Sequence, residues 1–87
     1  MCSVYVLYSE KLQRSYVGCS TNVEERLRAH NAKQVHATRA GVPWQLVYVE
    51  AAGMHLEARR RERYYKSGAG RRRLKSIFET WRGGRVV

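Results

Sequence analysis

The fold of this 87-residue chain is decided by two segments near its amino terminus, Ser3-Val4-Tyr5-Val6-Leu7-Tyr8-Ser9 and Arg14-Ser15-Tyr16-Val17-Gly18-Cys19. Both are rich in β-branched and aromatic residues, and the polar residues between them predict a turn, so we expect an antiparallel hairpin. The expected register places Tyr5 opposite Tyr16, and Val4 opposite Val17 on the other face. Since both faces of this hairpin are apolar, helices are predicted to cover the sheet on two sides.

The rest of the chain predicts one more strand and three helices. We expect a helix over 23–30, a loop over 31–44, a strand over 45–50, and helices over 54–66 and 69–81. Gly68 is placed to end the second helix, and residues 82–87 are expected to form a flexible tail. The sequence therefore predicts a single α+β domain over 1–87, with a core over 3–78. Its three-stranded antiparallel sheet is flanked by helices in the order β-β-α-β-α-α.

Positive charge is concentrated in one segment. Residues 59–75 hold nine basic residues and one acid, Glu62, which is a local charge of +8 in a chain of net charge +10. Such asymmetry favours a nucleic-acid partner, because a protein that neutralises phosphates releases counterions. Arginine, which supplies most of the charge, adds forked donors for phosphate oxygens. The alternative is a basic, solvated face that has no partner.

Composition argues against several classes of protein. No stretch approaches the roughly 20 apolar residues of a transmembrane helix, and the amino terminus lacks the layout of a signal peptide. Two cysteines, Cys2 and Cys19, without a Cys-x-x-Cys pair, give little support to a structural zinc site or a disulfide framework. We therefore expect reduced thiols, a cytoplasmic location and no membrane partner.

Glu62 is the first candidate for chemistry. It is predicted to lie on the inner side of its helix, one turn after Ala58 and one turn before Tyr65. The structural interpretation is an ion pair with Arg59 or Lys66 at helical spacing. The functional interpretation is a metal ligand, since Mg²⁺ takes oxygen ligands and often uses only one or two carboxylates together with water and substrate phosphate.

Tyr5 and Tyr16 form a second group, together with two side chains of the helix that follows. Both tyrosines are expected on one face of the hairpin, and Gly18 would leave space there for a substrate backbone. Arg26 and His30 fall on the helix side that faces this hairpin, where an arginine can hold a phosphate and a histidine can pass protons. Each also has an ordinary interpretation, as strand packing, a surface cation or a helix-end cap.

Taken in order, these residues resemble the GIY-YIG nuclease superfamily, and most closely its small stand-alone bacterial members. The resemblance covers about residues 3–78. It is carried by Val4-Tyr5-Val6, Tyr16-Val17-Gly18, Glu24-Glu25-Arg26-Leu27-Arg28-Ala29-His30-Asn31, Pro43-Trp44-Gln45-Leu46-Val47-Tyr48 and the helix from Glu57 to Gly68. Three departures stand out: Ser3-Val4 replace Gly-Ile, Val17 replaces isoleucine, and no asparagine follows Asn31, whereas some members use a late asparagine near the phosphate.

The resemblance implies a metal-dependent endonuclease that hydrolyses phosphodiester bonds of DNA, in a repair or recombination setting. Glu62 would hold one Mg²⁺ or Mn²⁺, and Arg26 would stabilise charge on the scissile phosphate. Tyr5 would activate water or relay its proton, Tyr16 would position water and phosphate, and His30 would support the relay. The alternative is a catalytically silent nucleic-acid-binding module that uses the basic 59–75 segment.

The expected contacts to nucleic acid follow from helix geometry and from the loop after the first helix. Arg60 and Arg63 are predicted to remain in solvent. The other candidates are expected to form a track for the phosphate backbone: Gly18, His36, Arg59, Arg61, Lys66, Arg71, Arg72 and Arg73. Because no element of the chain is suited to reading many base edges, we expect low sequence specificity and a preference for single-stranded or branched DNA.

Overall fold

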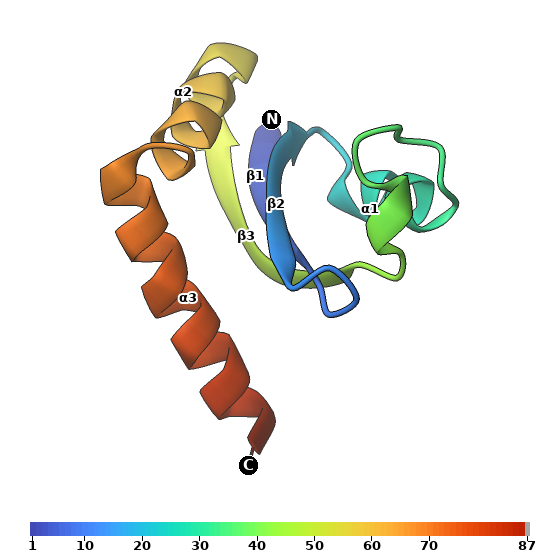
Figure 1. Ribbon diagram of the computed structural model, residues 1–87. Coiled ribbons are helices and arrows are strands. Elements are labelled where there is room, and N and C mark those ends of the chain that lie inside the picture. The colour runs from blue at the N-terminus through green and yellow to red at the C-terminus, as the bar shows by residue number, and fades with distance from the viewer. Residues whose placement is uncertain (87) are drawn as a thin grey trace.

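A computed structural model describes residues 1–86, with side chains described for residues 1–81. In this range the chain forms a three-stranded antiparallel sheet and three α-helices, so the predicted α+β class and the order β-β-α-β-α-α are confirmed (Figure 1). The elements are β1 (Cys2–Ser9), β2 (Arg14–Ser20), α1 (Val23–Asn31), β3 (Gln45–Gly53), α2 (His55–Tyr65) and α3 (Gly68–Val86), with a short 3-10 helix at Arg39–Gly41.

The hairpin register differs from the predicted one by two residues. Tyr5 pairs with Gly18 and Leu7 pairs with Tyr16, so the expected pairing of Tyr5 with Tyr16 is wrong. The cause is the turn, in which Ser9 pairs with Arg14 across four loop residues. Its geometry is fixed by a hydrogen bond of 3.2 Å from the Leu12 backbone N–H to Ser9 Oγ. Since the shift is an even number of residues, Tyr5 and Tyr16 still share one face.

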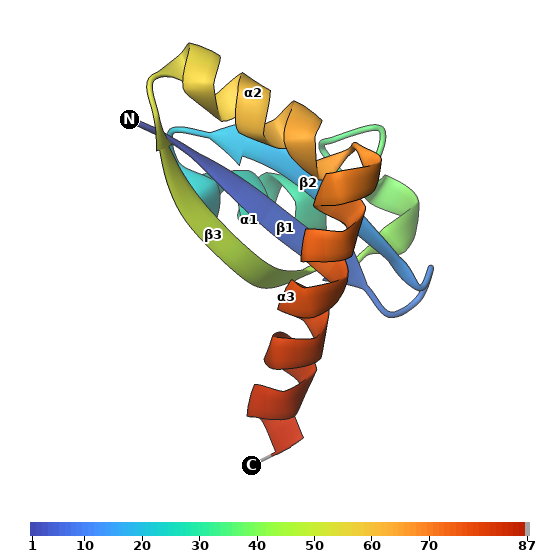
Figure 2. The same cartoon turned by 90° about the vertical axis from the view of Figure 1, so that its left-hand side faces the viewer.

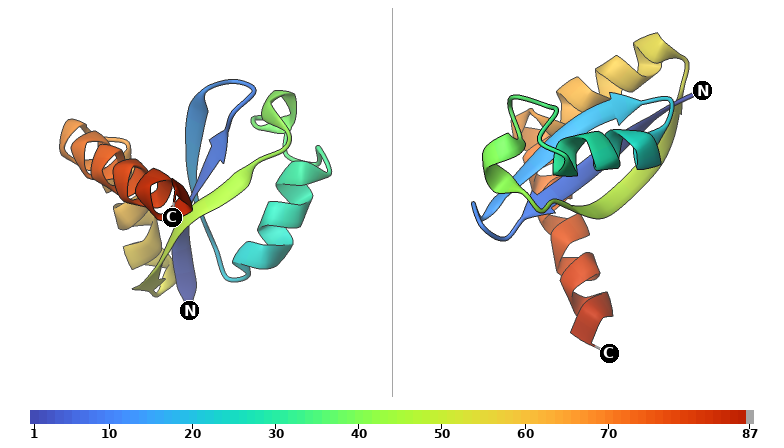
Figure 3. Two further views of the ribbon diagram at one scale, coloured as in Figure 1. Left: turned by 90° about the horizontal axis from the view of Figure 1, so that it is seen from below. Right: turned by 90° about the vertical axis from the view of Figure 1, so that its right-hand side faces the viewer.

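The sheet lies between two helical layers, as expected from its apolar faces. Figure 1 shows α1 on one side and α2 with α3 on the other, and Figure 3 shows the same arrangement from below. The strand order β2-β1-β3 puts β1 at the centre and leaves β2 at one edge. Successive side chains of each strand point to opposite faces of the sheet, so along β1 and β2 they alternately face α1 and the layer of α2 and α3.

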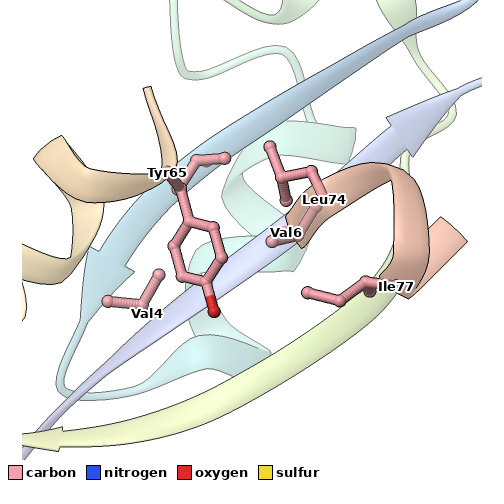
Figure 4. Close-up of a cluster of buried hydrophobic side chains, with 6 residues drawn as sticks. Val4, Val6, Tyr65, Leu74 and Ile77 are labelled. Atoms are coloured by element: carbon pink, nitrogen blue, oxygen red, sulfur yellow. The ribbon is translucent and has the colours of Figure 1, made fainter. Parts of the chain in front are cut away.

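The layer of α2 and α3 holds the larger core. Figure 4 shows Tyr65 pointing from α2 toward Val4 and Val6 of β1, with Leu74 and Ile77 of α3 beside them. Figure 2 shows α2 and then α3 following the same face of the sheet. The opposite layer has a smaller core of Tyr5, Leu7 and Trp44, packed against Tyr16, Val23 and Leu27.

The loop after α1 is fastened at both ends. The side-chain amide of Asn31 accepts a hydrogen bond from the Trp44 backbone N–H at 2.6 Å and donates one to the Trp44 backbone oxygen at 3.1 Å. The Trp44 indole N–H in turn donates to the Thr38 backbone oxygen at 2.7 Å. These three bonds hold the loop against α1 and fix where Thr38 lies.

The helices at the carboxyl end differ from the prediction in two respects. α2 ends at Tyr65 and Gly68 begins α3, so Gly68 does not end the second helix. Gly70 brings α3 so near to the Tyr64 backbone that a Cβ atom would clash with it. α3 continues to Val86, so residues 82–86, expected as a tail, are helical, while Val87 lies outside the described residues. None of the helices within residues 1–86 combines the length and the apolar character that crossing a bilayer requires.

Candidate active site

A buried line of hydrogen bonds joins β1, α1 and the loop. The Tyr5 hydroxyl lies 2.9 Å from His30 Nε2, and His30 Nδ1 lies 2.7 Å from Thr38 Oγ1. Tyr5 is 1% exposed, and His30 and Thr38 are fully buried. The Tyr16 ring completes the cluster, with its centroid 6.5 Å from that of Tyr5 and 5.1 Å from that of His30. The structure thus brings together three of the residues predicted to carry chemistry.

The direction of these hydrogen bonds follows from their far end. We assign the His30 tautomer from this network: Thr38 Oγ1 is within reach of the Val35 backbone oxygen at 3.4 Å as a donor, which leaves it to accept from His30 Nδ1–H at 2.7 Å. This tautomer leaves His30 Nε2 without a proton, and Tyr5 donates to it. Burial lowers the pKa of His30, with a further contribution from the charge of Arg26, and burial raises the pKa of Tyr5. Both groups are therefore neutral near pH 7, with the proton on the tyrosine.

Arg26 supplies positive charge at this cluster. It is exposed on α1, one turn before His30, and its guanidinium opposes the rise in the pKa of Tyr5 that burial causes. The same charge lowers the pKa of His30. Arg26 therefore lies beside the Tyr5–His30 pair, as predicted. Arg28 is two residues further along, about 200° around the helix, and points elsewhere.

Gly18 has a different role from the one expected. A Cβ atom on Gly18 would lie 2.6 Å from the Tyr5 hydroxyl oxygen and 3.1 Å from the Tyr16 ring. The space beside this glycine is therefore filled by the end of Tyr5, and no room remains there for a substrate backbone. Gly18 is what allows the two tyrosines to approach each other across the hairpin.

Replacing this glycine tests that conclusion. Gly18→Ala is expected to destabilise the fold by about 1–3 kcal/mol, because the added methyl group displaces the buried Tyr5 ring. Chemical denaturation measures the loss. Ser15→Ala, at an exposed position of the same strand, is the control and is expected to change stability by less than about 0.5 kcal/mol. Equal stabilities of the Gly18→Ala and Ser15→Ala variants would contradict the close packing.

Glu62 lies on α2 with its side chain 28% exposed, and its Oε2 atom pairs with Lys66 Nζ at 3.0 Å. The ion pair foreseen as the structural interpretation is therefore present. Burial alone would raise the pKa of Glu62, but Lys66, the nearby Cys19 thiol and the charge of Arg59 hold that pKa below its ordinary value. The carboxylate is ionised at neutral pH and borders a surface hollow lined by Leu56, Arg59, Arg60, Arg63 and Lys66.

The two groups of candidate residues belong to different layers. Tyr5, Tyr16 and His30 lie on the α1 face, whereas Glu62 neighbours Cys19, whose pairing with Val4 puts it on the opposite face. A second hollow along the outer edge of β2 is lined by both Tyr16 and Lys66. Since Lys66 is also the partner of Glu62, the site extends around this strand edge from one layer to the other.

The residues present fit a metal ion that uses few protein ligands. Among the described side chains, no three His, Cys, Asp or Glu residues are grouped closely enough to hold a metal. Glu62 is an ionised carboxylate that is partly open to solvent, which suits Mg²⁺ or Mn²⁺ bound by one carboxylate together with waters and substrate phosphate. A closed structural zinc site, which needs four ligands, does not fit.

The predicted phosphate track is divided by the structure. Arg59 and Lys66 line the hollow at Glu62, as expected, and so do Arg60 and Arg63, which are nevertheless exposed. Arg61, another residue of the predicted track, does not line this hollow. Its Nε atom pairs with Glu50 Oε2 of β3 at 2.6 Å, and its guanidinium lies over the Tyr64 ring.

Glu50 accounts for the position of Arg61. Burial alone would raise the pKa of Glu50, but hydrogen bonds from Arg61, Tyr65 and Tyr48 lower it, so the carboxylate stays charged on β3. A charged and half-buried carboxylate needs a cation, and Arg61 is one helical turn beyond Ala58 on the side of α2 that faces β3.

Arg71, Arg72 and Arg73 of α3 do not share one surface. Arg71 lines the hollow at the edge of β2, whereas Arg73 lines a hollow against Val47 and Tyr48 of β3. Arg72 is exposed between these two directions, and His36 is exposed on the loop after α1. Residues 71–73 therefore face different directions, because successive helix positions are about 100° apart.

Sequence reasoning missed two residues that hold the site. Thr38 fixes the His30 tautomer, and Asn31 fastens the loop that carries Thr38. Asn31 ends the motif that runs from Glu24, so the sequence did single it out. Its partner Trp44 is 13 residues away, and only the folded loop reveals their contact. Thr38 lies in a segment without periodicity and gave no signal in the sequence.

Comparisons with known proteins match most of the chain. Residues 1–75 match the family model of the GIY-YIG catalytic domain. The chain is 36% identical over 70 residues to a UPF0213 protein of Bacillus licheniformis, an alignment that covers 79% of this chain and 72% of the relative. It is 42% identical over 65 residues to a UPF0213 protein of Staphylococcus haemolyticus, covering 74% and 79% respectively. No solved structure gives a significant match.

Proposed function

This chain belongs to the GIY-YIG family of nuclease catalytic domains, and we propose that it is a metal-dependent endonuclease that hydrolyses phosphodiester bonds of DNA. The observation that carries the proposal is the Tyr5–His30–Thr38 line of hydrogen bonds beside Arg26. His30 Nε2 lies within hydrogen-bond distance of the Tyr5 hydroxyl, so a proton can pass between the two groups. An open Arg26 guanidinium at the same place suits a phosphate.

The proton path follows from the tautomer. As water attacks phosphorus, the Tyr5 oxygen accepts a proton from that water while the Tyr5 hydroxyl proton passes to His30 Nε2. His30 becomes an imidazolium, and its lowered pKa favours prompt return of the proton. Tyr5 is thus a relay that need not be ionised beforehand, which agrees with its raised pKa. Tyr16, half-buried beside this pair, is placed to orient the water and the phosphate.

Two charges would stabilise the reacting phosphate. Arg26 would face the oxygens that gain negative charge, as a preorganised cation does. Glu62 would hold the Mg²⁺ or Mn²⁺ ion, and the bound ion would neutralise charge on the leaving oxygen. Lys66, released from Glu62 when a metal binds, would be free for a phosphate contact.

The substrate is proposed to be bound through its backbone. Exposed cations on α2 and α3 give affinity without reading bases, so cleavage would show low sequence specificity and favour single-stranded or branched DNA. The two thiols, Cys2 and Cys19, are free, and we accordingly place the protein in the cytoplasm.

The Glu62–Lys66 ion pair favours a second candidate function, a catalytically silent nucleic-acid-binding module. A domain in which this pair persists would bind nucleic acid through residues 59–75 without cutting it. Labelled single-stranded, duplex and branched DNA, incubated with the protein and Mg²⁺, Mn²⁺ or EDTA, separates the two functions. We expect cleavage with either metal ion and none with EDTA. Binding to all substrates without cleavage of any would support the silent module.

A further inference from the structure

The hollow at the outer edge of β2 has a charged rim and an apolar floor. Val17, Tyr65 and Leu74 are 6%, 1% and 8% exposed, so they form the floor. The polar lining comes from three elements: Ser15 and Tyr16 of β2, Lys66 just after α2, and Arg71 in the first turn of α3. No carboxylate is among the residues that line this hollow, but one of its two cations, Lys66, is paired with Glu62 next to it.

The hollow shares one residue with each of the two groups of candidate active-site residues. Its Tyr16 is the same residue whose ring lies 5.1 Å from that of His30, and its Lys66 is the partner of Glu62. A strand held between Arg26 and Glu62 would pass the edge of β2, because Arg26 lies beside Tyr5 on one face and Glu62 lies beside Cys19 of β2 on the other. The next group along that strand then reaches the hollow.

The position of Arg71 is fixed by the fold. Gly70 packs α3 against the Tyr64 backbone, and the Arg71 backbone N–H donates to the Ser67 backbone oxygen at 2.9 Å. Lys66 and Arg71 therefore project from a tight connection between two helices. Because the backbone that carries these two cations is held in place, little backbone freedom is lost when they bind a phosphate group.

Building on the proposed function, we propose that this hollow is a second phosphate site, which binds the phosphodiester group next to the scissile one on the cleaved strand. Arg71 and Lys66 hold its oxygens, and Ser15 adds a hydroxyl donor. The substrate class is thus a nucleic-acid strand that continues past the cut, with at least one further charged linkage on the side of Tyr16. Arg73, which faces β3, takes no part.

A matched pair of variants tests binding alone. Arg71→Ala and Arg73→Ala each remove one exposed arginine from the same helix. In EDTA, with single-stranded DNA, Arg71→Ala should lower the slope of log K against log salt concentration by about 0.7, and Arg73→Ala should leave the slope unchanged. Equal loss of slope in both variants, or no loss in Arg71→Ala, would overturn the second phosphate site whether or not the protein cuts DNA.

A neutral linkage then locates the contact. Oligonucleotides that carry one methylphosphonate, placed in turn at each linkage around the cut, are cleaved with Mg²⁺. For wild type and Arg73→Ala, one neighbouring position should raise KM by about tenfold, the value of one charge-assisted hydrogen bond. For Arg71→Ala the same substitution should have no further effect. An undiminished effect in Arg71→Ala would assign that linkage to other residues and overturn the proposal.

If the protein cuts no DNA, the proposed endonuclease activity fails and the salt slopes still decide the hollow. A lowered slope confined to Arg71→Ala then assigns the hollow to phosphate binding in a silent module. Circular dichroism of both variants serves as the control for folding, because both side chains are exposed and neither is expected to affect it.

Discussion

Glu62→Gln is expected to reduce cleavage by at least about 10²-fold while DNA binding stays equal or becomes tighter. Glutamine keeps the shape of the side chain but lacks the charge that a divalent ion requires. It also releases Lys66, which now lies 3.0 Å from Glu62, for contact with phosphate. Single-turnover cleavage with Mg²⁺ or Mn²⁺ and fluorescence anisotropy with labelled DNA measure the two effects.

Glu57→Gln is the matched control. It makes the same change of charge in the same helix, but Glu57 Oε2 accepts from the Met54 backbone N–H at 2.6 Å and lies away from the hollow at Glu62. The control should cut DNA at the wild-type rate. If Glu62→Gln is folded and also cuts at that rate, Glu62 is not the metal ligand.

The second large effect is expected at Arg26. Arg26→Ala should lower the cleavage rate by about 10²-fold, because a positioned charge donor is lost where the phosphate gains negative charge. Arg28→Ala removes the same charge from an exposed position of the same helix and should cost far less. Rates measured at saturating DNA separate this effect from weaker binding.

The pKa of His30 gives an independent readout for the Arg26→Ala and Arg28→Ala variants. The charge of Arg26 lowers the pKa of His30, so Arg26→Ala should raise that pKa toward its ordinary value, and Arg28→Ala should not. NMR of the His30 ring measures both. Equal pKa values and equal, small losses of rate in the two variants would mean that Arg26 does not face the tyrosines.

The fold could be predicted because each element carries a clear pattern. Both α1 and α3 were expected from the helical period, and the sequence places His30 on the side of its helix that faces the hairpin, where the structure buries it. The hairpin register could not be predicted, since it depends on the turn and on the hydrogen bond from Leu12 to Ser9. A register error of two residues leaves every side chain on the same face of the sheet. Tyr5 and Tyr16 are therefore still predicted on one face.

The site was predictable only as far as residue type and helix face allow. Tyr5, Arg26 and His30 could be brought together from periodicity. Arg61 could not be placed correctly, because its position depends on Glu50, a carboxylate 11 residues earlier on another element. In a segment with nine basic residues, the sequence does not say which cation a buried acid will take.

The clamp between Asn31 and Trp44 bears on how this chain can diversify. The two hydrogen bonds between the Asn31 side chain and the Trp44 backbone close the loop without using the residues in between. A separate hydrogen bond, from the Trp44 indole N–H, holds the Thr38 backbone oxygen. Extra residues between Gln34 and Val35 would then lengthen only a solvent-facing stretch, at a modest entropic cost that grows slowly with length. That stretch is a point at which evolution or a protein engineer could graft a recognition segment without disturbing the proton path.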